Sequence, residues 1–140
     1  MGQQWQTREP ARSARVENTS RRVISLTKMQ ALALLARLTD SYDVALTFFP
    51  RNDPRFPIIH HAVERLALEI EERNTATIET DNDARILADC VNNSPLHDHL
   101  VTLLHEEDIN DVQFKEWSEA MSSVTLLLKS NGVAAERFPT

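Results

Sequence analysis

Residues 95 to 108 read PLHDHLVTLLHEED and place three of the chain's five histidines among four carboxylates. Imidazoles and carboxylates are common metal ligands and the usual acids and bases of catalysis. On a helix such groups converge only at spacings of three or four residues, because each residue turns about 100°. His97 and His99 have no histidine or carboxylate at these spacings. Within the stretch, only His105 and Asp108 are spaced so that they could converge. The stretch therefore predicts a structural helix that buries Leu96, Leu100, Leu103 and Leu104.

The same stretch also supports a metal-dependent alternative. His97 and Asp98 form an adjacent histidine–aspartate pair. A histidine on an earlier helix, His60 or His61, and a later aspartate, Asp108 or Asp111, could complete a set of four ligands. This pattern resembles that of HD-domain metal-dependent phosphohydrolases. The resemblance implies an all-α enzyme in which these side chains hold a metal that activates water for attack on phosphorus. It covers four dispersed residues, and helical periodicity places His60 and His61 opposite the core-facing side.

Composition excludes several other kinds of chemistry. The chain has 140 residues, enough for one domain with a real core. Its single cysteine, Cys90, excludes an internal disulfide framework and fits a cytoplasmic protein. With only Gly2 and Gly132, the chain cannot form a glycine-rich phosphate-binding loop. We therefore expect a non-enzymatic protein without a cofactor or a metal site.

The N-terminal segment differs from the rest of the chain in charge. Residues 1–22 carry five arginines against two glutamates, whereas the whole chain has a formal charge of −6. We expect this segment to be a disordered arm, because it lacks apolar periodicity. Its phosphate-binding candidates, with Trp5 available for stacking, are Arg8, Arg12, Arg15, Arg21 and Arg22. The alternatives are a solubilising tail and a twin-arginine export signal, to which SRRVISL followed by MQALALLA is similar.

Residues 23–131 are predicted to form a single-domain all-α bundle of about five helices, followed by a tail over 132–140. The segment from Leu26 is apolar on most sides and predicts a central helix, which continues through Asp40 and Ser41 or restarts there, and ends by Pro50. The second helix has Pro57 at its first position and an apolar face of Ile59, Ala62, Val63, Leu66 and Ile70. No stretch shows sustained strand alternation, and no apolar run approaches the roughly 18 residues of a membrane span.

Capping residues mark the later helices. Thr80 and Asp83 have capping-box spacing and predict a helix that buries Ala84, Leu87, Ala88 and Val91. Ser94 is the expected cap of the next helix, with Pro95 at its first position. Residues 108–111 are expected to cap the last helix, and Asn131-Gly132 to end it.

The last helix contains the most regular apolar pattern of the chain. Its members alternate spacings of three and four, and they are Phe114, Trp117, Met121, Val124 and Leu128. Large aromatic and sulfur-containing side chains are frequent anchors of protein interfaces, although the same pattern suits a domain's own core. We expect a small helical protein that binds another protein as an adaptor, inhibitor or assembly factor, and self-association through this helix is an alternative. Nucleic-acid binding through residues 1–22 and HD-type hydrolysis are the other function classes.

Overall fold

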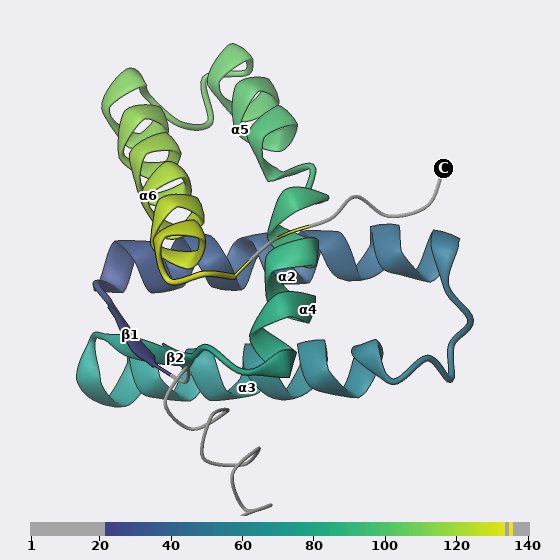
Figure 1. Cartoon of the computed structure of the whole chain (residues 1–140). Helices are drawn as coiled ribbons and strands as arrows, with labels where there is room; N and C mark the ends of the chain where they lie inside the picture. The colour runs from purple at the N-terminus through teal and green to yellow at the C-terminus, as the bar shows by residue number, and fades with distance from the viewer. Residues whose placement is uncertain (1–21, 134, 136–140) are drawn as a thin grey trace, which may run out of the picture.

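The structure is a computed structural model that describes residues 22–133 and 135. Its elements, shown in Figure 1, are β1 (Val23–Leu26), α2 (Lys28–Phe48), α3 (Arg55–Arg73), β2 (Ala76–Glu79), α4 (Asn82–Asn92), α5 (Leu96–His105) and α6 (Asp111–Ser130). The protein is therefore mostly helical, as the sequence predicts. Residues 1–21 and most of the predicted 132–140 tail lie outside the described residues.

The central position predicted for the first helix is confirmed. Thr27 and Gln30 form a capping box at the start of α2, which runs without a break through Asp40 and Ser41 and ends before Pro50. α2 contacts α3, α4, α5, α6 and β1. Because α2 has neighbours on several sides, Ala33 and Leu34, which point about 100° apart, can both be fully buried.

A small sheet corrects the strictly all-α prediction. β1 and β2 pair antiparallel, with Ile24 opposite Ile78 and Leu26 opposite Ala76, and all four of these side chains are buried. Each strand has only four residues, so its alternation is too short to be recognised as a sustained pattern.

The hydrogen-bonded ladder continues one residue beyond the strands and changes the predicted start of α4. The amide of Arg22 donates to Thr80 Oγ1, and the amide of Thr80 donates to the Arg22 carbonyl. Thr80 is therefore not the cap of α4. The predicted Thr80–Asp83 capping box is wrong, and the carboxylate of Asp81 instead accepts from the amide of Ala84.

Two other predicted helix starts are displaced by one or two residues. α3 begins at Arg55 after Pro54, so Pro57 is in the first turn rather than at the first position. Proline is tolerated there because the first four amides of a helix have no partner within it. α5 begins at Leu96, with Pro95 in the cap position, although the amide of Leu96 still donates to Ser94 Oγ as the capping prediction requires.

The core consists of two groups of buried side chains. The larger group joins α2, α3, α4, the sheet and the C-terminal half of α6, and contains the predicted inward residues Ile59, Leu66, Leu87 and Val91. The smaller group lies between α2, α5 and the N-terminal half of α6. Figure 1 shows α5 and the start of α6 rising from α2 on the side opposite α3. None of the helices in the described part of the chain is long and apolar enough to cross a membrane.

Candidate functional site

The predicted partner-binding residues of α6 divide into an internal and an external set. Met121, Val124 and Leu128 are buried, so they belong to the core of the domain. Phe114 and Trp117 are only partly buried. Of the five predicted residues, these two aromatic side chains alone could reach a partner without opening the fold.

Phe114 and Trp117 lie at the outer edge of the smaller core group, in the hairpin formed by α5 and α6. They pack against buried Leu96, Leu100 and Met121, and Leu103 and Ile109 complete this packing. Two neighbouring apolar side chains of the hairpin are more exposed, Val101 at 37 % and Val112 at 68 %. The start of α6 therefore presents apolar surface to solvent.

The connection between α5 and α6 is held by backbone and capping hydrogen bonds. The amide of Asp108 donates to the Leu103 carbonyl at 2.9 Å, and Glu107 adopts a left-handed conformation with φ 63°. Asn110 then caps α6 reciprocally with Gln113. The prediction that residues 108–111 contain the cap is confirmed, and Asn110 provides it. These bonds fix the loop that presents the acidic residues.

A hollow of about 560 Å³ lies at this connection. Its lining combines carboxylates with apolar and amide groups, and consists of Leu104, Glu107, Asp108, Ile109, Asn110, Asp111 and Gln113. Within the described residues, Glu106, Glu107 and Asp108 form no ion pair with a cation of the chain. Negative charge at the C-terminal end of α5 is also unfavourable for that helix, because it faces the negative end of the helix dipole. We call the connection between α5 and α6 and the first two turns of α6, which carry this hollow, Val112, Phe114 and Trp117, the hairpin end.

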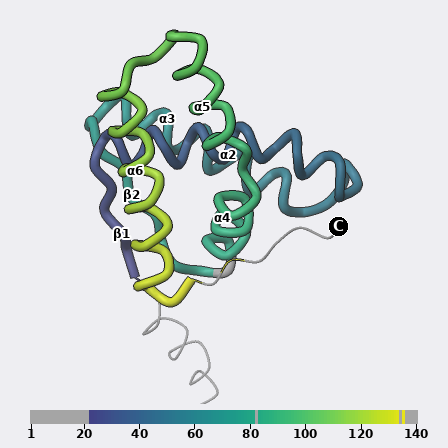
Figure 2. Tube along the Cα trace, turned by 90° about the horizontal axis from the view of Figure 1, so that it is seen from above, coloured from purple at the N-terminus to yellow at the C-terminus, as the bar shows by residue number. Residues whose placement is uncertain are grey.

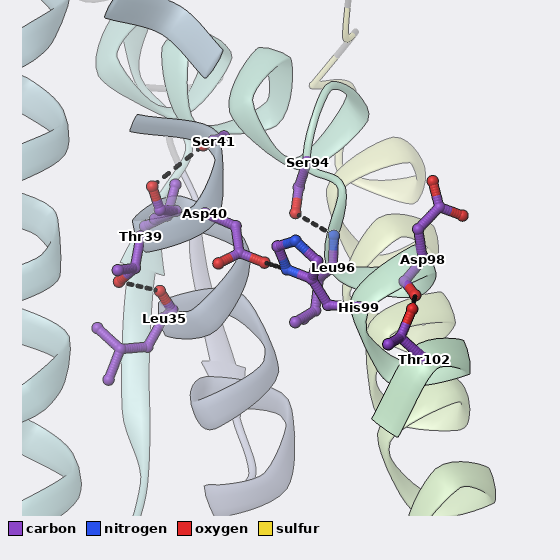
Figure 3. Close-up of polar contacts among 10 residues, drawn as sticks. Leu35, Thr39, Asp40, Ser41, Ser94, Leu96, Asp98, His99 and Thr102 are labelled. Carbon is purple, nitrogen blue, oxygen red and sulfur yellow. Dashed lines mark hydrogen bonds and ion pairs between the residues drawn. The ribbon is translucent and has the colours of Figure 1, made fainter. Parts of the chain in front are cut away.

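The three histidines of residues 95–108 do not converge on one site. Figure 3 shows His99 of α5 directed at Asp40 of α2, with Nδ1 and Oδ2 2.8 Å apart. The ring of His97 lies 6.1 Å from the ring of Phe114, measured between centroids. Across residues 22–133, no group of three or more histidine, cysteine, aspartate or glutamate side chains is placed to hold a metal ion. The residues of the HD-type pattern therefore do not assemble into such a group.

Of the other candidates from the sequence, Arg22 and Cys90 are among the described residues. Arg8, Arg12, Arg15 and Arg21 lie outside the described residues, so nucleic-acid binding by this arm stays a prediction. Arg22 is described and exposed, with its backbone in the ladder beside β1. Cys90 is buried, as expected of a small core residue. Burial raises the pKa of its thiol to about 11, and a hydrogen bond with Ser41 opposes part of this rise.

Comparisons with protein-family models, curated proteins and solved structures find no match to this chain. The residues of the hairpin end are therefore the basis of the function proposed below. Sequence reasoning identified two of its aromatic side chains but missed the hollow. The sequence does contain an indication of the hollow, because the acidic residues Glu106, Glu107 and Asp108 follow one another at the end of a helix where negative charge is unfavourable.

Proposed function

We propose that this protein binds another protein through the hairpin end, as an adaptor, inhibitor or assembly factor without catalytic activity. The proposal rests on the hollow, whose lining includes Glu107, Asp108 and Asp111, and on half-buried Phe114 and Trp117, which follow it on α6. Aromatic side chains that are anchored on one side and open on the other are typical interface anchors.

The charge of the hairpin indicates the chemistry of the partner. Residues 96–130 contain seven carboxylates and two lysines. A lysine or arginine of a partner could place its alkyl stem against Leu104 and Ile109, with its charged group at the carboxylates of the hollow. A second copy of the chain suits this surface less, because two acidic hairpin ends would repel each other. The proposed partner is therefore a protein with a basic, partly apolar contact surface.

Charge reversal tests this proposal. The protein is isolated from its own cells with its bound partner, and the partner is then purified for titration against the wild type and two variants. The double variant E106K/E107K reverses two adjacent exposed glutamates at the hairpin end. The double variant E71K/E72K makes the same change in charge on α3 and is the matched control.

We expect E106K/E107K to weaken the complex by at least about tenfold, mainly at low salt, while E71K/E72K changes the affinity much less. The reversal should not unfold the protein, because lysines suit the C-terminal end of α5 better than glutamates do. Equal affinities of the two variants, or an affinity of the wild type that does not depend on salt, would show that the partner binds elsewhere.

A further inference from the structure

A second cavity, separate from the hairpin end, lies among α2, α4, α6 and the segment after α6. Its volume is about 560 Å³, within the range of small-molecule sites. Figure 1 shows α4 and α6 both crossing α2, and Figure 2 shows the chain turning from the end of α6 toward α4. The residues that line the cavity come from α2, α4, α6 and the segment after α6.

The end of α6 explains how the segment after it is fixed. Gly132 has φ 81°, its amide donates to the Lys129 carbonyl, and the amide of Val133 donates to the Leu128 carbonyl. This is the Schellman arrangement, which ends a helix with a left-handed residue and confirms the predicted stop at Asn131-Gly132. It holds Val133 beside Leu128, and both residues line the cavity.

Arg37 of α2 supplies a cation to this cavity. Its Nη1 atom donates to the Met121 carbonyl at 3.3 Å and to Thr125 Oγ1 at 3.1 Å. Its Nε atom is buried and has no hydrogen-bond partner, and no carboxylate in the described part of the chain lies within ion-pair distance. Burial lowers the pKa of this guanidinium, so its charged form lacks the stabilisation that an anion would give.

The surroundings of Arg37 indicate what kind of anion would fit. Arg37 lines the cavity, and a planar guanidinium can donate two parallel hydrogen bonds to a carboxylate. The apolar part of the lining includes Ala88, Val91, Leu128 and Val133, and Asn92 and Thr125 are its uncharged polar members. Lys129 adds a second cation at the exposed side. A compact inorganic anion would leave the apolar part of the lining without a contact.

We propose that this cavity binds a small organic carboxylate, whose charged group accepts hydrogen bonds from Arg37 and whose apolar body packs against Val91, Leu128 and Val133. The site would make the protein a receptor for a small metabolite as well as a protein-binding module. It does not depend on the hairpin end, so either proposal can fail while the other holds.

Nuclear magnetic resonance titration of the full chain with sodium hexanoate tests this site. The matched probes are 1-hexanol, which keeps a six-carbon body without the charge, and inorganic phosphate, which has charge without the body. We expect saturable shifts at the backbone amides of Val91, Thr125 and Val133 with hexanoate. Hexanol and phosphate should each bind at least about tenfold more weakly, because each lacks one of the two contacts.

The variant Arg37→Met keeps much of the apolar stem and removes the charge. It should weaken hexanoate binding roughly tenfold to a hundredfold and leave hexanol binding unchanged. Arg51→Met removes an exposed arginine from the loop after α2 and should leave hexanoate binding unchanged. The comparison of hexanoate, hexanol and phosphate on the wild type stands even if Arg37→Met fails to fold.

Four results would overturn the proposal of a carboxylate site. The first is hexanol binding as tightly as hexanoate, and the second is phosphate binding as tightly as hexanoate. The third is a folded Arg37→Met variant that retains the wild-type affinity for hexanoate. The fourth is a set of shifts that maps to a different part of the protein.

Discussion

The Nδ1 atom of His99 lies 2.8 Å from the Oδ2 atom of Asp40, and this contact joins α5 to the middle of α2 (Figure 3). The two residues are 59 positions apart in the sequence. The His99 side chain is 59 % exposed and that of Asp40 24 %. A histidine that could have served as a metal ligand or a catalytic base instead helps to hold the hairpin on the central helix.

A double-mutant cycle of His99→Ala and Asp40→Ala should give a coupling free energy below about 1 kcal/mol. Water and salt screen a polar contact as exposed as this one, so its net contribution is small. Urea unfolding of the wild type, both single variants and the double variant measures the coupling. A coupling well above this value would mean that the pair is shielded from solvent or belongs to a larger network.

Truncating an apolar side chain should cost more stability in the C-terminal half of α6 than at its start. Met121→Ala removes a buried side chain and should cost about 2 to 5 kcal/mol of unfolding free energy. Trp117→Ala should cost about 2 kcal/mol, less than for a fully buried tryptophan, because its side chain is partly exposed. Denaturant unfolding of both variants checks this order. A greater loss for Trp117→Ala would show that its indole is internal and unable to anchor a partner.

Ile78→Ala tests the unexpected sheet. The side chain of Ile78 is 2 % exposed and belongs to the larger core group, so its truncation should cost about 2 to 5 kcal/mol. Val23→Ala on the paired strand is the control, because Val23 is 62 % exposed and should change the unfolding free energy little. Similar small losses for both variants would contradict the packing of the sheet into the core.

Burial of Cys90 should make the stability of the protein fall at alkaline pH. The pKa of its thiol is about 11 in the folded protein, against an ordinary value of 9.0. Between these values the folded state keeps a proton that the unfolded state has released, so stability decreases as the pH rises. The contribution of Cys90 to this loss should reach about 1 kcal/mol at pH 10.

The variant Cys90→Ala separates this effect from the titration of other groups. Urea unfolding of the wild type and the variant at pH 7 and pH 10 gives the four free energies needed. The wild type should lose more stability than the variant between the two pH values. Equal losses would mean that the thiol ionises in the folded protein as readily as in the unfolded chain.

The sequence was most informative where apolar side chains recur over several helical turns. The inward faces of α3 and α4, the central position of α2 and the end of α6 at Gly132 all follow from such patterns and from caps. Strands of four residues give only two buried positions each, so Ile24 and Ile78 had no pattern long enough to indicate their pairing. Thr80 had the spacing of a cap, yet the sheet ladder used its hydroxyl.

The candidate sites depend on contacts between distant segments, which periodicity does not reveal. In the sequence, nothing distinguishes Arg37 from the other charged residues of the same helix, Lys28, Asp40 and Asp43. Only the fold brings it to Thr125 and to the cavity wall at Val133. The hairpin end was partly foreseeable, because Phe114 and Trp117 begin the apolar pattern of the last helix. The apolar pattern of α6 could not show that α2 covers the C-terminal half of this helix and leaves the side chains at its start partly exposed.

Position-resolved photo-cross-linking tests the central claim, partner binding at the hairpin end, most directly. A photoreactive amino acid replaces Val112 at the hairpin end or Leu126 further along α6, which are 68 % and 64 % exposed and so tolerate the change equally. Both variants are irradiated in the cells that normally produce the protein. We predict a cross-link from position 112 to one protein with a basic contact surface, with much less from position 126. Equal yields at the two positions, or a cross-link only from position 126, would contradict the proposed function.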